Sequence, residues 1–259
     1  MNTTSRECTQ NVQAVDKAFE LLETLSEHKN GMSLEQLAAR CGLNKNRTQR
    51  LAATLCKRGL VEQEKGTGIY RMGIHSVVIA QKFLQNSHLL NHAHPIMAEL
   101  AKKHGEAVYL TVFKGGEVVF VDMIDSNRNI KATSLVGKKF PFHTNAAGKV
   151  LAALDSWDLL EKLLAKLKNR SGGTGLGQLR TELDEIRSKG VAVDVDALGD
   201  DISSVAVVVR DYAGKVVGAL TMLGPSFRMI QTRLEQEIIP SLCEYAEILS
   251  LKFGYAQAT

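Results

Sequence analysis

The N-terminal third of the chain places apolar residues at helical spacing between short polar turns. A first helix is predicted over residues 12–25, because its apolar residues recur three and four positions apart. This stripe is expected to face inward and comprises Val12, Val15, Ala18, Phe19, Leu22 and Leu25. Ser33 and Gln36 have the spacing of a capping box, which predicts the start of a second helix. Asn44 is a favourable N-cap for a third helix, which is expected to stop at Gly59.

The second and third helices are joined by a short turn in which Gly42 can adopt a positive φ. Two helices connected in this way predict a helix-turn-helix. Residues 60–64 and 69–72 then read as two strands around a loop that contains two glycines, so the motif is expected to be winged. We therefore predict a disordered N-terminus over residues 1–10, a winged helix-turn-helix domain over 11–73 and a linking helix over 74–90.

The pattern changes in the remainder of the chain, residues 91–259. Strands are predicted at 107–113, 117–124, 130–136, 191–195, 205–210 and 215–223. Helices are predicted at 95–104, 145–154, 156–167, 179–189 and 227–253. Strands in antiparallel runs with helices gathered to one side indicate an α+β domain of the kind that senses small molecules.

Composition narrows the setting. The chain has 259 residues and a formal net charge of only +4, and no apolar run approaches the ~20 residues of a membrane span. Residues 1–10 are polar, and the four cysteines form no CxxC pair. These features favour a reduced, cytoplasmic protein without a membrane partner.

The charge distribution says more than the total. No acidic residue occurs between Gln36 and Val61, whereas Arg40, Lys45, Arg47, Arg50, Lys57 and Arg58 are basic. Such a cluster is typical of a phosphate-binding face, although charge alone fits a solvated helical surface equally well.

The winged motif adds a geometric reason to expect DNA binding. The outward positions at the start of the third helix are Lys45, Asn46, Arg47, Gln49 and Arg50, while Thr48 is expected in the core. Arg47 and Asn46 are predicted to contact base edges, because Arg matches guanine and Asn matches adenine. Lys45 and Arg50 are predicted to contact phosphates. Ser33 at the second helix and Lys65 in the wing complete the predicted DNA-binding set.

Several short motifs, in this order, resemble the IclR family of bacterial transcription regulators. They are Leu43 to Leu51 with Leu55 and Arg58-Gly59-Leu60, the wing end Tyr70 to Gly73, the stretch Gly137 to Lys149, Asp211 to Gly218, and Gly224-Pro225-x-x-Arg228. The resemblance covers nearly the whole chain after residue 10. It implies a homodimer or homotetramer, a GAF-like second domain that binds a small organic acid, and operator binding that responds to this effector, with repression as the favoured direction.

Positions that match the family's effector contacts are Ala132, Phe140, Ala146, Ala147, Asp194, Ile202, Ser204 and Thr221. The amides near Ala146 and Ala147, at a helix N-terminus, suit a carboxylate. Phe140, Phe142 and Leu223 favour a bulkier or aromatic acid. The sequence departs from the family where Leu223 replaces a hydroxyl residue and Ser204 stands at a position that is often cysteine, so the effector's identity does not carry over.

Other functions have weaker support. An enzyme or a metabolite sensor without a DNA role is the alternative, with the basic helices making only protein contacts. His88, His92 and His94 have spacing that could suit a metal, but no cysteine or carboxylate nearby in the sequence completes a ligand set. His143 has no evident activating partner. No catalytic residue, metal or cofactor is predicted.

Overall fold

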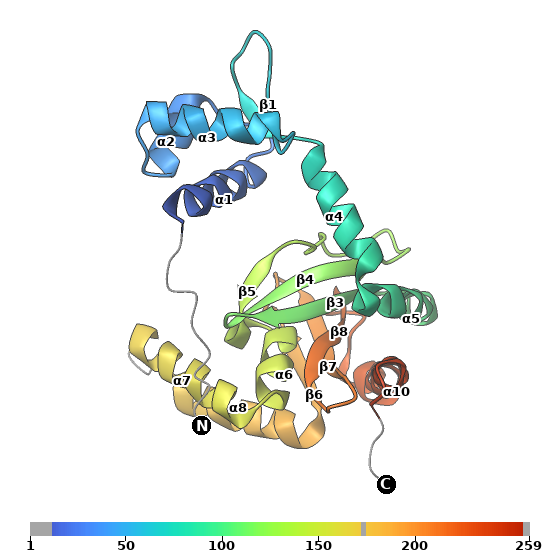
Figure 1. Cartoon of the computed structure of the whole chain (residues 1–259). Coiled ribbons are helices and arrows are strands. Elements are labelled where there is room, and N and C mark those ends of the chain that lie inside the picture. Colours follow the sequence, from blue (N-terminus) through green and yellow to red (C-terminus); the bar gives the residue numbers. More distant parts are fainter. Residues whose placement is uncertain (1–11, 172–174, 256–259) are drawn as a thin grey trace. The chain divides into compact units, whose positions relative to one another are not determined.

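The computed structural model describes residues 12–171 and 175–255, and divides into two compact units, 1–86 and 87–259 (Figure 1). The predicted N-terminal disorder falls outside the described residues. The first unit contains α1 (Gln13–Ser26), α2 (Leu34–Arg40), α3 (Lys45–Lys57), β1 (Val61–Gln63), β2 (Tyr70–Met72) and α4 (His75–Asn86). The strands pair in antiparallel fashion, and Met32 adds a bridge to Tyr70. The winged helix-turn-helix prediction is confirmed.

The core of the first unit differs from the predicted one at α1. Leu21 and Leu25 are buried and pack with residues of α2, α3 and both strands. Val12, Val15 and Phe19 are instead 65%, 52% and 61% exposed, so the prediction that they face inward is wrong. The helical period was assigned correctly, but a second apolar face of α1 lies outside this core.

The predicted linking helix over residues 74–90 is interrupted. α4 ends at Asn86, and Ser87 adopts an extended conformation in which its hydroxyl accepts a hydrogen bond from the Leu90 N–H at 3.4 Å. A serine in this role starts a new helix instead of continuing the old one. α5 (His88–His104) therefore begins earlier than predicted, with Pro95 inside it, and belongs to the second unit.

The second unit is built on a six-stranded antiparallel sheet of order β5-β4-β3-β8-β7-β6. Its strands are β3 (Ala107–Lys114), β4 (Glu117–Ile124), β5 (Lys139–Pro141), β6 (Val191–Val195), β7 (Ile202–Arg210) and β8 (Val216–Pro225). The other elements are a 3-10 turn (Phe142–Thr144), α6 (Ala146–Leu154), α7 (Trp157–Ser171), α8 (Leu176–Lys189), α9 (Gln231–Arg233), a π-helical turn (Leu234–Ile238) and α10 (Ile239–Lys252).

Helices cover both faces of this sheet, in contrast to the expected arrangement on one side. α5 and α10 contact β3, β4 and β7 on one face, while α6 packs on the other, with α7 and α8 outside it (Figure 1). The reason lies in the central strands, because residues 107–111 of β3 and 218–225 of β8 are buried continuously. A strand that is buried at consecutive positions must be covered on both sides.

Two further predicted elements differ in the second unit. Residues 125–138 form a loop, and the strand expected at 130–136 is absent from this described segment. The edge of β4 pairs instead with β5, where Val119 lies opposite Lys139. The predicted closing helix at 227–253 begins at Gln231, after the extended residue Ile230.

Candidate nucleic-acid interface and ligand site

Side-chain and backbone caps fix the two helices of the DNA-binding motif. The Ser33 hydroxyl accepts from the Gln36 N–H at 3.3 Å, and the Gln36 side chain accepts from the Ser33 N–H at 2.8 Å, which confirms the capping box. The Asn44 side chain accepts from the Arg47 N–H at 2.8 Å at the start of α3. At the end of α3, Gly59 has a φ of 69°, and the Leu60 N–H donates to the Leu55 carbonyl at 3.0 Å. This is a Schellman motif, and it sets the direction in which the chain enters the wing.

Burial defines the outward face of α3. Thr48 and Ala52 are fully buried, and the Thr48 hydroxyl donates to the Asn44 carbonyl at 3.0 Å, so Thr48 lies in the core as predicted. Three polar side chains, Asn46, Gln49 and Arg50, are exposed on the opposite side. Because residues three and four apart share a helix face, these side chains form one polar surface that could enter a DNA groove.

Lys45 and Arg47 lie at the two flanks of that surface. Lys45 pairs with Glu35 of α2 at 2.6 Å, and this hydrogen bond lowers the pKa of the Glu35 carboxyl. Arg47 is half-buried, and its Nη2 donates to the Gln13 side-chain oxygen of α1 at 3.1 Å. The structure therefore does not place Arg47 at the centre of the outward face, where Arg50 lies instead.

The wing carries both acidic and basic side chains. Lys65 is exposed in the loop between β1 and β2, as a backbone contact requires. Glu64 beside it accepts from the Thr67 hydroxyl at 2.7 Å and from Arg71 at 3.5 Å. Glu35 before the acid-free stretch and Glu64 in the wing are therefore each paired with a cation, Lys45 and Arg71 respectively.

The predicted effector residues meet on one face of the sheet in the second unit. Asp194 lies opposite Ser204, which lies opposite Leu223, so these three residues share a row across β6, β7 and β8. Thr221 is in the next row on the same face, opposite Tyr109 of β3. Directly opposite residues of antiparallel strands point to the same side of a sheet.

The N-terminus of α6 covers this face. Ala146 and Ala147 are fully buried, and the preceding Asn145 caps the helix by accepting from the Gly148 N–H at 2.9 Å. Three predicted residues that are partly buried, Ala132, Phe140 and Ile202, pack against the same apolar cluster. The predicted effector positions are therefore gathered around one helix end and one sheet face.

Lys149 is a buried cation at this site that the sequence analysis missed. Its Nζ lies 2.7 Å from Asp194 Oδ1 and 2.7 Å from Glu182 Oε1. These two hydrogen bonds raise the pKa of Lys149 even though burial acts in the opposite direction. Burial and the neighbouring Glu182 raise the pKa of Asp194 despite Lys149. A lysine inside the apolar helix of residues 146–154 was the available sequence signal.

Three buried polar atoms at this site have no hydrogen-bond partner among the described residues. They are Asp194 Oδ2, Thr221 Oγ1 and the hydroxyl oxygen of Tyr109, which lies opposite Thr221 on β3. Leaving such a group unsatisfied costs about 1–3 kcal/mol. All three atoms lie on the face that α6 covers, so a bound polar molecule could satisfy them.

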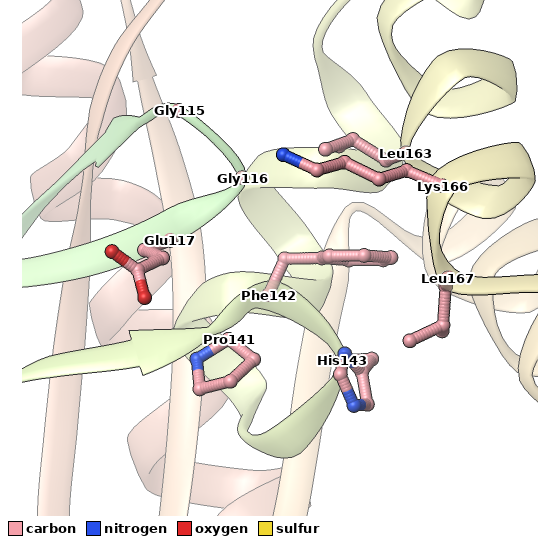
Figure 2. Close-up of a pocket in the computed structure, with 9 residues that line it drawn as sticks. All are labelled: Gly115, Gly116, Glu117, Pro141, Phe142, His143, Leu163, Lys166 and Leu167. Carbon is pink, nitrogen blue, oxygen red and sulfur yellow. The ribbon is translucent and has the colours of Figure 1, made fainter. Parts of the chain in front are cut away.

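A separate pocket has a volume of about 270 Å³ (Figure 2). It is bounded by the turn between β3 and β4, by the segment that precedes α6, and by helix α7. Phe142, Leu163 and Leu167 form apolar walls, and the Lys166 side chain extends over Phe142 toward Gly116. The predicted effector residues do not line this pocket. This pocket, which contains Lys166 and Glu117, therefore serves as a control for the effector site.

Two of the three histidines considered for a metal, His92 and His94, have other contacts. The His92 ring packs edge-on against Phe253, and His94 Nδ1 lies 2.9 Å from Asp122 Oδ2. Within residues 12–171 and 175–255, none of the helices is both long and apolar enough to span a lipid bilayer.

Comparison with known proteins identifies the family. The model of the IclR helix-turn-helix domain matches residues 14–65, and that of the bacterial transcriptional regulator IclR C-terminal domain matches residues 81–251. The acetate operon repressor of Salmonella typhimurium is 26% identical, over 97% of this chain and 93% of the repressor.

Solved structures share the fold. An IclR regulator from Alicyclobacillus acidocaldarius has a TM-score of 0.83 and 25% identity, over 95% of this chain and 100% of that protein. An IclR homologue from Microbacterium hydrocarbonoxydans, solved with 4-hydroxybenzoate, has a TM-score of 0.78 and 21% identity, over 93% and 99% of the two chains. Together with the capped helix-turn-helix, the two family matches establish that this chain belongs to the IclR family of DNA-binding bacterial transcriptional regulators.

Proposed function

We propose that this chain is a homodimeric repressor that is controlled by a small organic acid carrying a hydrogen-bond donor as well as a carboxylate. The observation that carries the proposal is the pair of buried, unsatisfied polar atoms on Asp194 and Thr221 beside the start of α6. Repression is the direction suggested by the acetate operon repressor, a relative of similar length.

For DNA, we assign base reading to the outward surface of α3. Asn46 and Gln49 can pair with adenine, and Arg50 can bond the O6 and N7 atoms of guanine. Because Arg47 is half-buried and held by Gln13, we assign it to a phosphate beside the groove. Lys65 contacts the backbone from the wing, and Ser33 does so from the start of α2.

For the effector, the chemistry of the site defines a class of ligand. The N-terminal amides of α6 at Ala146 and Ala147 can donate hydrogen bonds to a carboxylate. An ionised Asp194 can only accept hydrogen bonds, so its free Oδ2 requires a donor such as a hydroxyl. Thr221 can donate or accept. Phe140 and Ile202 provide apolar walls around these groups.

Matched acids test this assignment. 4-Hydroxybenzoate is expected to bind about tenfold more tightly than benzoate, and lactate more tightly than propanoate, because only the first member of each pair offers a hydroxyl to Asp194. Thr221→Val keeps the volume of the side chain but removes the hydroxyl, and should lower the affinity for the preferred acid by about tenfold. Isothermal titration calorimetry on the full chain measures both effects.

Lys166→Ala serves as the matched control, because Lys166 lines the pocket of Figure 2 and is not one of the proposed effector residues. It should leave the affinity unchanged. If Lys166→Ala abolishes binding while Thr221→Val does not, the acid occupies the other pocket. If the hydroxylated and unsubstituted acids bind equally, the requirement for a donor is wrong.

The affinity for the effector and the affinity for operator DNA are then coupled through the dimer. A ligand can shift operator binding only by its differential affinity for two arrangements of the protein, and DNA must shift ligand affinity by the same factor. A repressor released by its effector should therefore bind that effector more weakly when operator DNA is present.

We propose that a second copy of the chain covers the exposed apolar faces of the first unit. On α1, Val12, Val15 and Phe19 are exposed and share one face. On α4, Val77 and Ile79 are each 52% exposed. Because these side chains are already about half buried, burying the rest of each one stabilises an assembly by about 1 kcal/mol, and a two-fold dimer presents two recognition helices to two half-sites.

Charge substitutions on these faces test the dimer. Phe19→Glu combined with Val77→Glu should shift the chain toward monomer in sedimentation velocity, because each glutamate would have to be buried at the interface. Tyr212→Glu is the control, since Tyr212 is 81% exposed in the second unit. An unchanged sedimentation coefficient in the double variant would place the interface elsewhere.

A further inference from the structure

Glu106, directly before β3, is a fully buried carboxylate that the effector site does not use. Arg228 donates to it through two nitrogens, Nε to Oε1 at 2.7 Å and Nη2 to Oε2 at 2.8 Å. Arg233 Nη1 adds a third bond at 3.1 Å. A Cβ on Gly224 would lie 2.5 Å from Glu106 Oε2. The carboxylate therefore fits beside the end of β8 because residue 224 is a glycine.

The arginine reaches beyond the carboxylate. Arg228 Nη2 also donates to the backbone carbonyl of Ile130 at 2.9 Å. Ile130 lies in the middle of the loop 125–138, which has no helix or strand. At the start of this loop, the Ser126 hydroxyl donates to the Gly105 carbonyl at 2.7 Å. A bidentate pair leaves the guanidinium little freedom, so the position of Ile130 is determined by Glu106.

Part of this loop packs in the core that contains the start of α6. Ala132 and Leu135 pack in the same apolar cluster as Ala146 and Ala147. Because Ala146, Ala147 and Thr221 have no exposed surface, a ligand reaches them only when a covering segment moves. We infer that Arg228, held by Glu106, is a positioning residue that keeps the loop 125–138 closed over the site and thereby sets effector affinity and exchange rate.

The inference rests on the proposed function for its effect on the ligand, but the loop anchor can be measured without one. Arg228→Lys retains a cation for Glu106 but cannot supply the bidentate pair and the bond to Ile130 together. Arg233→Lys is the matched control. Arg233 also contacts Glu106, but its other bonds go to the carbonyls of Arg228 and His104, outside the loop.

Hydrogen–deuterium exchange of the ligand-free chain is the first measurement. Amides of residues 127–134 should exchange about tenfold faster in Arg228→Lys relative to the amides of β3, and remain as in the wild type in Arg233→Lys. The β3 amides report global unfolding, so a variant that is merely less stable is distinguished from one with an open loop. Equal loop exchange in Arg228→Lys and the wild type overturns the inference.

Glu106→Gln provides a second variant. It keeps the volume of the side chain but weakens the bidentate pair, so it should also speed exchange at residues 127–134 relative to β3. Stopped-flow binding of 4-hydroxybenzoate should then show faster dissociation in both Arg228→Lys and Glu106→Gln. If loop exchange rises while the wild-type chain binds none of the acids tested, the anchor stands and the proposed effector class fails. Faster loop exchange with unchanged dissociation of a bound acid overturns the role of Arg228 in ligand binding.

Discussion

Arg50→Ala should lower affinity for the preferred DNA sequence by about 1–3 kcal/mol while changing affinity for random DNA much less. The reason is geometric. Arg50 lies with Asn46 and Gln49 on the exposed surface of α3, opposite the buried Thr48 and Ala52. A guanidinium at the centre of that surface can reach a guanine edge in the major groove.

The experiment begins with selection of a preferred site from a random pool by the wild-type chain. Affinities for that site and for unrelated DNA are then measured at several salt concentrations. Lys65→Ala is the contrasting variant, because a lost phosphate contact weakens both DNAs alike and reduces the salt slope by about 1. Arg47→Ala should resemble Lys65→Ala. Loss of sequence preference in Arg47→Ala, with preference kept in Arg50→Ala, would reverse the two assignments.

Local signals predicted the DNA-binding motif well. Ser33, Asn44 and Gly59 each affect the backbone within a few positions along the chain. Each forms the helix cap or the turn that its chemistry favours. Thr48 was placed in the core because its neighbours on the helix face are apolar. Interactions between residues only a few positions apart depend on one continuous stretch of sequence, so pattern and spacing suffice to predict them.

Long-range features could not be found in this way. The apolar stripe of α1 has a clear period, but a period does not say whether the covering surface is the chain's own core or a second copy. Lys149 meets Asp194 45 residues later, and Arg228 meets Glu106 122 residues earlier. Such pairs depend on strand order, which the sequence pattern left open. The strand predicted at 130–136 is absent because the edge of β4 pairs with β5 instead, a long-range choice that the local pattern does not specify.

Gly148→Ala should destabilise the second unit by about 3 kcal/mol, even though alanine is the better helix former. Gly148 lies in the first turn of α6, where a Cβ would enter the van der Waals radius of the Phe142 carbonyl oxygen and lie 2.7 Å from the Phe142 Cα. These are backbone atoms of the turn that precedes the helix, so no side-chain rotation relieves the overlap. The start of α6 must shift, and the amides of Ala146 and Ala147 shift with it.

Gly177→Ala is the matched substitution, because it also replaces a helical glycine, in α8, and its added Cβ meets no described atom within 4 Å. It should be neutral or stabilise by about 0.5 kcal/mol. Thermal unfolding followed by circular dichroism should separate the two, with a midpoint roughly 6–12 °C lower in Gly148→Ala. Because the α6 amides are the proposed carboxylate site, Gly148→Ala should also weaken acid binding at a temperature where it remains folded. If Gly148→Ala unfolds at the same temperature as the wild type, the backbone before α6 can move aside at little cost in free energy. A helix start that moves so easily could not hold a carboxylate in a fixed position.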